Sequence, residues 1–238
     1  MLPRTRGANL LLVGDRDDDE TPDLSLRGVL HSLLLASQLQ GSATTTVDFI
    51  GDEEVEGGLT IMEVAEIAGS RYVRSSSLEL VLRDLAALVA TRTSEGNYRD
   101  ATQLLVLFGL QRALSLAPYD PYSMDGSDEP SVAQLLSAIM VSGPEVGVHV
   151  VVDADRSRSV ESRLGSELIQ EFMIRVAGSA ADAKDLGLVS GSYGDIAPLR
   201  FGQLLIGDHL KGTTKRARGY KILTTAPVGS EKESTNGE

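Results

Sequence analysis

The stretch formed by residues 9–38 constrains the fold of this chain more than any other. It opens with an apolar run, Asn-Leu-Leu-Leu-Val, that stops at Gly14. It closes with a segment, residues 24–39, in which apolar side chains recur at helical spacing. A short buried strand, a loop and an amphipathic helix form the scaffold of a phosphate-binding loop. The stretch therefore predicts an α/β domain of the nucleotide-binding type.

The loop itself contradicts phosphate binding. Residues 15–23 read Asp-Arg-Asp-Asp-Asp-Glu-Thr-Pro-Asp, with six acids, one base and no glycine. A net negative loop would face an anionic triphosphate, and one like-charge pair at ~4 Å costs about 4 kcal/mol at an effective dielectric constant near 20. We therefore interpret the chain as a nucleotide-fold domain whose nucleotide site has been lost.

The length and composition fit one large α/β domain. The chain has 238 residues, 42% of them hydrophobic but only 4% aromatic, so we expect an aliphatic core. We predict a single domain over residues 1–223. Residues 224–238 are polar and glycine-containing and predict a disordered tail.

Strand and helix patterns alternate along the chain. Strands alternating with helices give crossover connections and a mostly parallel central sheet with helices on both faces, which is a three-layer architecture. Beyond the first strand and helix, strands are predicted at residues 44–50, 72–73, 103–109, 147–153, 171–176, 202–207 and 218–223. Helices are predicted at 59–68, 78–93 (N-cap Ser77), 110–116, 131–141 (N-cap Ser131), 160–167 and 179–186, with a surface loop at 117–130.

Charge and cysteine content exclude some kinds of site. A net charge of −12 repels nucleic acid and anionic membranes unless a local basic patch offsets it. The absence of cysteine excludes disulfides and thiolate metal sites. No apolar run approaches the roughly 18 residues of a membrane span, so no membrane insertion is expected. The simplest localisation is cytoplasmic, with association to a membrane complex only through partners.

The second half of the chain resembles the FtsK/SpoIIIE-type motor ATPases. The stretch LLSAIMVSGPEVGVHVVVDADRSRSV is similar to the family's helix, glycine and G-[IV]-H-[LIV]3 strand. The following IQEFMIRVAGSAADAKDLGL is similar to its next strand and helix, and FGQLLIGDHLKGTTKRARGY to its terminal hairpin. The resemblance covers residues 9–223 and implies a P-loop NTPase (RecA-like) fold. The EccC-like domains of type VII secretion, some of them degenerate, are one group of possible relatives.

The resemblance also locates the lost phosphate loop. Gly14 matches its first glycine, whereas the lysine position falls at about Pro22 and the Ser/Thr position at about Asp23. Proline has no N–H to donate, and neither residue supplies the cation or hydroxyl that holds the phosphates and Mg²⁺.

Two further motifs of the family are replaced. The Asp-Glu pair that ends a buried strand is matched by Phe108 and Gly109, which can neither ligate a metal nor take a proton. Of the later Thr-Gln-Arg-Pro motif only Arg156 remains. We therefore expect no catalytic residue and no bound cofactor, with ATP and Mg²⁺ relevant only if an alternative reading holds.

Metal sites are not favoured. Asp15, Asp17 and Asp19 alternate like the start of a calcium loop, but Glu20 and Leu26 stand where such a loop needs glycine and glutamate. A solvated acidic loop is the favoured interpretation. The histidines are scattered and do not suggest zinc: His31, His149 and His209.

Two groups of basic residues are candidate partner contacts. One forms a cluster near the C-terminus: Lys211, Lys215, Arg216, Arg218 and Lys221. The cluster is either a solvated hairpin that balances an acidic protein or a contact with an acidic partner surface or nucleic acid. Arg156 and Arg158 could reach the nucleotide of a neighbouring subunit, as an arginine finger does. The alternative is that they have a structural role.

Three functions remain open from the sequence. The first is a catalytically inactive FtsK/SpoIIIE-like domain that acts as a structural, regulatory or partner-binding module of a larger ATP-driven assembly. Its partners would be other ATPase domains or subunits. The alternative is an active ATPase, or one completed in trans, that moves DNA or protein. A second alternative is a nucleic-acid-binding module that uses residues 211–221, which the net charge disfavours.

Overall fold

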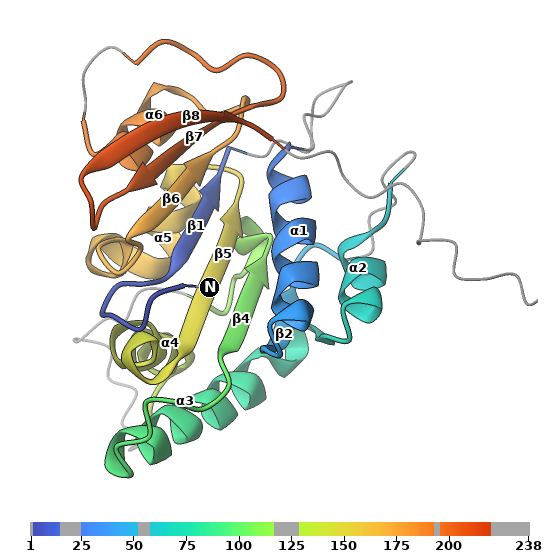
Figure 1. Ribbon diagram of the computed structural model, residues 1–238, viewed down its shortest axis with the longest axis vertical. Helices are drawn as coiled ribbons and strands as arrows, with labels where there is room; N and C mark the ends of the chain where they lie inside the picture. The colour runs from blue at the N-terminus through green and yellow to red at the C-terminus, as the bar shows by residue number, and fades with distance from the viewer. Residues whose placement is uncertain (1, 15–24, 52–57, 117–128, 193–195, 220–238) are drawn as a thin grey trace, which may run out of the picture.

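A single eight-stranded sheet forms the centre of the computed structural model, which describes residues 2–14, 25–51, 58–116, 129–192 and 196–219 (Figure 1). The strand order is β3-β2-β4-β5-β1-β6-β7-β8. The first six strands in this order run parallel, and β7 and β8 are antiparallel to their neighbours. The strands are β1 Leu10–Val13, β2 Ala43–Asp48, β3 Arg71–Arg74, β4 Gln103–Phe108, β5 Val148–Ala154, β6 Ile174–Ala177, β7 Gln203–Asp208 and β8 Thr213–Arg218.

Helices cover both faces of the sheet, which confirms the predicted three-layer architecture. Helices α1 and α2 lie on one face, and α3 to α6 lie on the other (Figure 1). The helices are α1 Ser25–Leu39, α2 Ile61–Ile67, α3 Leu78–Ser94, α4 Val132–Ser142, α5 Ser157–Ile169 and α6 Ala183–Ser190, and short 3-10 turns lie at η1 Ser75–Ser77, η2 Leu110–Arg112 and η3 Pro144–Val146.

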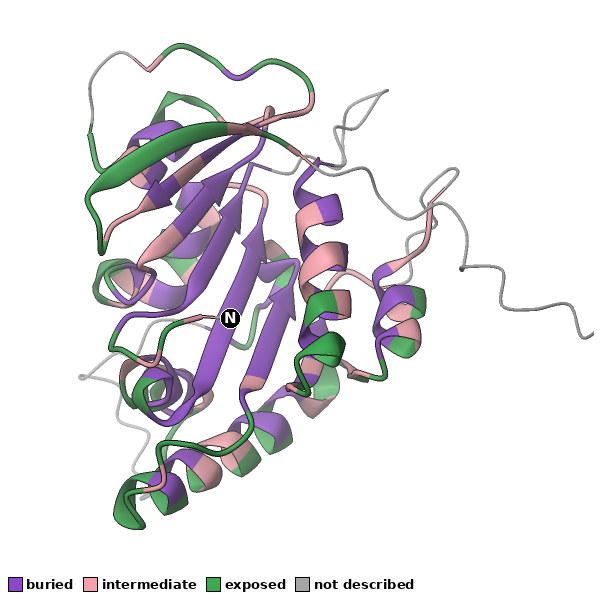
Figure 2. Ribbon diagram, in the orientation of Figure 1, coloured by how far each residue is buried: buried purple, intermediate pink, exposed green. Residues whose placement is uncertain are grey.

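The middle strands are buried on both faces because their sequences are apolar without alternation. Every residue of β1 and β5 is buried, as are all residues of β4 except Gln103 (Figure 2). Such strands suit the interior of a parallel sheet that is covered on both sides. On α1, Leu26, Leu30 and Leu34 recur four residues apart and pack as one stripe on the sheet.

Helix starts follow local capping chemistry. Thr60 with Glu63, Ser131 with Gln134, and Asp182 with Asp185 each form a capping box. Ser131 is thus the N-cap predicted from the sequence. Ser77 is also the N-cap residue of α3, as predicted, but it belongs to the turn η1 (φ −94°, ψ 2°) and its side chain makes no cap hydrogen bond.

Some predicted boundaries in the last third of the chain are wrong. A strand lies at Thr213–Arg218, where the sequence predicted none because the exposed side chains lack an apolar pattern. The strand expected at 218–223 falls mostly outside the described residues. The helix expected at 179–186 begins at Ala183, because its cap is Asp182. Residues 110–116 hold only a three-residue 3-10 turn. The predicted tail at 224–238, and with it the extent of the single domain, lies outside the described residues.

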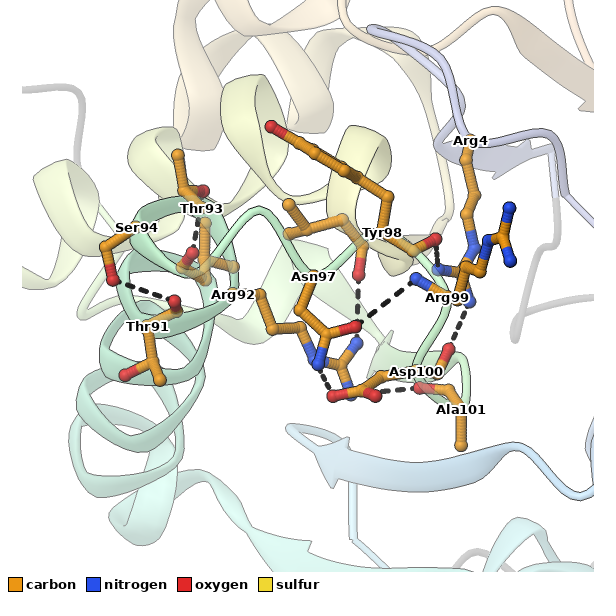
Figure 3. A network of polar contacts seen from close by, with 12 residues as sticks. Arg4, Thr91, Arg92, Thr93, Ser94, Asn97, Tyr98, Arg99, Asp100 and Ala101 are labelled. Carbon is orange, nitrogen blue, oxygen red and sulfur yellow. Dashed lines mark hydrogen bonds and ion pairs between the residues drawn. The ribbon is translucent and has the colours of Figure 1, made fainter.

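A polar network lies at the N-terminal ends of the central strands, opposite the candidate site described below (Figure 3). The buried guanidinium of Arg92 donates to the carbonyls of Val146 at 2.9 Å and Ala101 at 3.0 Å. Arg4 donates to the carbonyls of Tyr98 and Asp100. These bonds fix the turn between α3 and β4.

Among the described residues, none of the helices has the length and apolarity that a bilayer-spanning helix requires.

Candidate functional site

The site to test lies at the C-terminal ends of β1, β4 and β5, where open parallel sheets bind their ligands. These strands are neighbours in the order β4-β5-β1 and end at Phe108, Ala154 and Val13. The fold therefore brings the two predicted motif positions, after β1 and after β4, to one edge. Two other predicted positions, Pro22 and Asp23, and the aspartates of the calcium-like pattern lie outside the described residues.

Gly14 forms a tight turn after β1 that is packed against another loop. Its φ is +93°, and its N–H reaches the carbonyls of Ala154 and Asp155 at 3.3 and 3.1 Å. A Cβ at this position would lie 2.7 Å from the Cβ of Ala181. One at Gly178 would lie 3.0 Å from the carbonyl oxygen of Gly14. The loop between β6 and α6 thus rests directly on this turn.

The N-terminus of α1 is in contact with Gly219, the residue that follows β8. A Cβ at Gly219 would lie 2.3 Å from the Cβ of Ser25, the first residue of α1, and Ser25 is itself buried. In a phosphate-binding loop the first turn of this helix faces the phosphates. Here the residue that follows β8 contacts it instead.

The end of β4 carries Phe108 and Gly109 in place of acids. Phe108 is buried, and the guanidinium carbon of Arg27 lies 5.4 Å from the centre of its ring, a cation–π geometry. Gly109 has φ +76°, and a Cβ there would lie 2.1 Å from Cγ1 of Ile50. The backbone at position 109 therefore leaves no room for a side chain.

Sequence reasoning missed Asp153, a buried carboxylate at the same edge. It is the penultimate residue of β5, only 4% exposed, and its Oδ2 accepts from the N–H of Gly109 at 3.3 Å. The register that aligns Leu107 with Val152 puts Asp153 beside Phe108. An acid that ends a continuous apolar strand was the available signal. Asp48, which ends β2 beside Phe108, accepts from the amides of Ile50 and Gly51 and holds a turn.

These carboxylates do not amount to a metal centre. Within the described part of the chain, no three His, Cys, Asp or Glu side chains gather closely enough to hold a metal ion.

Comparison with known proteins gives matches to structures only. No family profile and no curated protein sequence matches this chain. The pCW3 conjugation coupling protein TcpA, solved as a monomer with ATPγS, matches 89% of this chain and 60% of its own length, with a TM-score of 0.61 and 16% identity. Thermomonospora curvata EccC (ATPases 2 and 3), solved with a signal sequence peptide, matches 90% of this chain and 37% of its own, with a TM-score of 0.57 and 14% identity.

A third match is a genome-packaging enzyme. NTPase B204 from Sulfolobus turreted icosahedral virus 2, solved with sulfate, matches 90% of this chain and 98% of its own, with a TM-score of 0.54 and 12% identity. This chain has an FtsK-like P-loop ATPase fold. The P-loop NTPase (RecA-like) fold that the resemblance implies is therefore confirmed.

The FtsK-like fold of this chain corresponds to only part of some relatives. It spans 60% of TcpA and 37% of the EccC chain. At identities of 12–16%, the likeness establishes the fold and leaves activity and partners to be argued from the residues.

Arg156, the one residue kept from the Thr-Gln-Arg-Pro motif, binds within the chain. Its Nη1 lies 3.2 Å from the carbonyl of Ala180, 3.3 Å from Asp185 Oδ2 and 3.4 Å from Asp182 Oδ2. Asp185 is fully buried and also accepts from the amide of Ser157 at 2.7 Å. The network joins the start of α5 to the start of α6. Arg158 is exposed on α5, and the predicted partner contact of both arginines stays a prediction.

The predicted basic cluster lies on β8 and the turn before it. Lys211 pairs with Asp208 at 3.1 Å, and its hydrogen bond lowers the pKa of that carboxyl. The described members of the cluster on the strand are Lys215, Arg216 and Arg218, all exposed. Lys221 lies outside the described residues.

The histidines of this FtsK-like domain are placed separately. His149 Nδ1 lies 2.8 Å from the carbonyl oxygen of Ala8, and burial lowers its pKa. His31 on α1 is 1% exposed, and burial, followed by the charge of Arg27, lowers its pKa to about 4. The pKa of His209 is also lowered, chiefly by burial. None of them reaches the C-terminal ends of β1 and β4.

A groove that the sequence did not predict separates α4 from α5. It encloses about 710 Å³ and has leucines and small polar side chains in its wall, including Leu116, Leu136, Leu164 and Leu168. At Gly165 (φ 76°, ψ 163°) α5 departs from helical geometry where it borders this groove. The groove lies on the face opposite α1.

Proposed function

We propose that this chain is a catalytically silent FtsK-like ATPase domain that works as a structural, regulatory or partner-binding module of a larger ATP-driven translocation or secretion assembly. The observation that carries the proposal is the C-terminal edge of β4. There Phe108 and Gly109 stand in place of acids, and the Ile50 side chain occupies the space that a side chain at 109 would need.

Two further observations support the loss of the nucleotide site. The backbone of Gly219 lies against Ser25 at the N-terminus of α1, where a bound phosphate would accept N–H groups. The second is a matter of sequence: residues 15–23, which precede this helix in the chain, include six acids and one base. The residues present do not fit an ATP–Mg²⁺ complex, so we derive no hydrolytic step.

The structural relatives support a role in an assembly. TcpA is a conjugation coupling protein, EccC a type VII secretion ATPase and B204 a genome-packaging NTPase, and all three share this fold. A retained scaffold without catalytic groups is useful if its surfaces still contact neighbouring ATPase domains or subunits. We place such an assembly in the cytoplasm, where it would reach a membrane complex through its partners.

Isothermal titration with Mg-ATP tests the proposal. We expect no measurable heat of binding at millimolar nucleotide, because the phosphate-loop positions lack the lysine and the Ser/Thr hydroxyl that hold the phosphates and Mg²⁺. An active relative with the same fold, titrated in the same buffer, serves as the positive control. Micromolar affinity of this chain would refute the proposal.

Asp153 favours one alternative, an ATPase that uses unusual ligands or is completed in trans. It is a carboxylate beside Phe108 at the edge where the metal and the attacking water would sit. This alternative predicts turnover by the chain, alone or mixed with a partner ATPase domain, that is lost in Asp153→Asn and in Asp23→Asn. Turnover that persists in both variants would reject Asp153 and Asp23 as the ligands.

A further inference from the structure

Among the residues that the structure describes, strand β8 forms a free lateral edge of the sheet that no layer of helices covers. It is the last strand in the order and, within these residues, pairs only with β7, antiparallel, with Ile206 opposite Lys215. Every side chain of β8 is exposed except Ala217, which is half-buried (Figure 2). A strand of this kind is held by its backbone bonds to β7 and offers its other edge to solvent.

The register identifies which backbone groups of β8 point outward. The amide of Gly219 donates to the carbonyl of Gly202 at 2.9 Å, which continues the β7–β8 register by one pair. Hydrogen-bonded pairs alternate along an antiparallel ladder. The N–H and C=O groups of Thr214, Arg216 and Arg218 therefore point away from β7.

The other side of β7 gives the same alternation. The amide of His209 donates to the carbonyl of Met173 at 2.7 Å, in register with the β6–β7 pairs. Odd-numbered residues of β7 therefore bond to β6 and even-numbered ones to β8. In the described ranges no backbone hydrogen bond reaches the outward groups of residues 214, 216 and 218.

The side chains around these groups are basic on both faces of the strand. Successive side chains alternate between faces, so Lys215 lies on the α1 face, and Arg216 and Arg218 lie on the α6 face. In the part of the chain that the structure describes, Lys215 and Arg218 make no ion pair, and the guanidinium of Arg216 donates to the carbonyl of Ala197. The concentration is notable in a chain of net charge −12.

The basic side chains of β8 determine which kind of strand can pair with this edge. A second copy of the chain pairing β8 with β8 would bring Lys and Arg side chains opposite one another, and like charges directly across a ladder are destabilising. Basic side chains on an edge strand thus oppose self-association, which is a usual way of protecting such edges. A segment that carries carboxylates on both of its faces would meet opposite charges instead.

We propose that the free edge of β8 binds an acidic, extended segment of a partner protein as an additional strand. The partner's main chain bonds to the outward groups of Thr214, Arg216 and Arg218, and its carboxylates pair with Lys215 on one face and with Arg216 and Arg218 on the other. This inference deepens the partner-binding role proposed above and rests on it.

Hydrogen exchange measured by NMR tests the backbone part of the proposal. The probe is a synthetic peptide of glutamate and valine residues, added to the full chain. The amides of residues 214, 216 and 218 exchange rapidly in the free protein and are slowed by the peptide, whereas those of 215 and 217, already bonded to β7, are unchanged. Protection of the outward amides in the free protein, or no slowing with saturating peptide, would overturn the proposal.

Two matched comparisons test the chemistry of recognition. The same peptide with alternate amides N-methylated keeps its charge but cannot bond along the edge, and it should bind roughly tenfold more weakly or not at all. The double variant Lys215→Glu/Arg218→Glu should weaken binding by a similar factor. The control variant Arg71→Glu/Arg112→Glu changes the charge equally at two exposed sites away from β8 and should bind as the native chain does.

Two results would count against strand addition specifically. Equal affinity for the N-methylated and unmodified peptides would show that binding depends on charge alone and not on backbone hydrogen bonds. Binding of a single-stranded oligonucleotide in preference to the acidic peptide would assign the edge to nucleic acid. The Mg-ATP titration is independent of both, so the silent-domain proposal and the β8 proposal can fail separately.

Discussion

At the residue scale, two glycines at the C-terminal ends of β1 and β4 are closely surrounded by protein atoms. Gly14 and Gly109 both have positive φ, and at both a Cβ would meet protein atoms closer than 3 Å. The sequence predicted that Gly14 matches the first glycine of a degenerate phosphate loop and that Gly109 stands in place of an acid. Their neighbours could not be predicted, because Ala181 and Ile50 reach them only through the packing of distant loops.

The Gly109→Ala substitution should destabilise the domain by about 2–5 kcal/mol, from a left-handed backbone that disfavours alanine and from overlap with Ile50. Gly41→Ala is the matched control, with φ +66° and no atom within 4 Å of the added Cβ, and should cost about 1–2 kcal/mol. Urea denaturation measures both. Equal losses in the two variants would show that the Ile50 contact is unimportant.

His31 should make the domain less stable in acid. Its pKa is about 4 in the folded protein and 6.5 as the ordinary value, so the folded state favours the neutral ring. The contribution of the neutral His31 ring to the free energy of unfolding is fully present above pH 6.5. It is lost as the pH falls from 6.5 towards 4, and the total loss is about 3 kcal/mol. Denaturation curves of the native chain and His31→Leu, measured across this range, should differ in slope by close to one proton. Parallel slopes would contradict the prediction.

At the scale of elements, the contact between the starts of α5 and α6 depends on one buried carboxylate. Asp185 serves as the capping-box partner of Asp182 and as the acceptor for Arg156 and the Ser157 amide. The sequence placed Arg156 in a catalytic motif. The fold instead turns its guanidinium towards α6, which shows that a retained motif residue can acquire a structural role.

The Asp185→Asn substitution should cost about 3–5 kcal/mol, because it removes the charge that compensates the mostly buried Arg156. Asp182→Asn is the control. Its side chain is half exposed, and asparagine caps helices about as well as aspartate, so a loss below about 1 kcal/mol is expected. Thermal and urea unfolding provide the comparison. A small loss for Asp185→Asn would mean that Arg156 finds another partner.

At the scale of the whole molecule, the domain combines an ATPase fold with an acidic surface and a basic free edge. A ligand that binds only the folded state stabilises it by RT ln(1 + [L]/Kd). If this domain has no nucleotide site, as we propose, ATP should therefore not change its free energy of unfolding.

Melting curves with and without millimolar Mg-ATP should superimpose. If the dissociation constant were a hundredth of the nucleotide concentration, binding would raise the free energy of unfolding by about 2.7 kcal/mol. The melting temperature of a domain of this size would then rise by roughly 5–11 °C. A rise of that order, absent with Mg²⁺ alone, would contradict the prediction and agree with a calorimetric titration that detects binding.

The sequence by itself determined the layer architecture and predicted that the family's catalytic groups are replaced. Continuous apolar runs such as β4 and β5 can only be buried between helices, and the residue types at positions 108 and 109 exclude acid chemistry wherever they lie. Only the tertiary structure decided how that edge is filled, that Asp153 lies beside Phe108, and that β8 is a two-sided exposed edge. These features depend on contacts between segments far apart in the chain, which local periodicity does not encode.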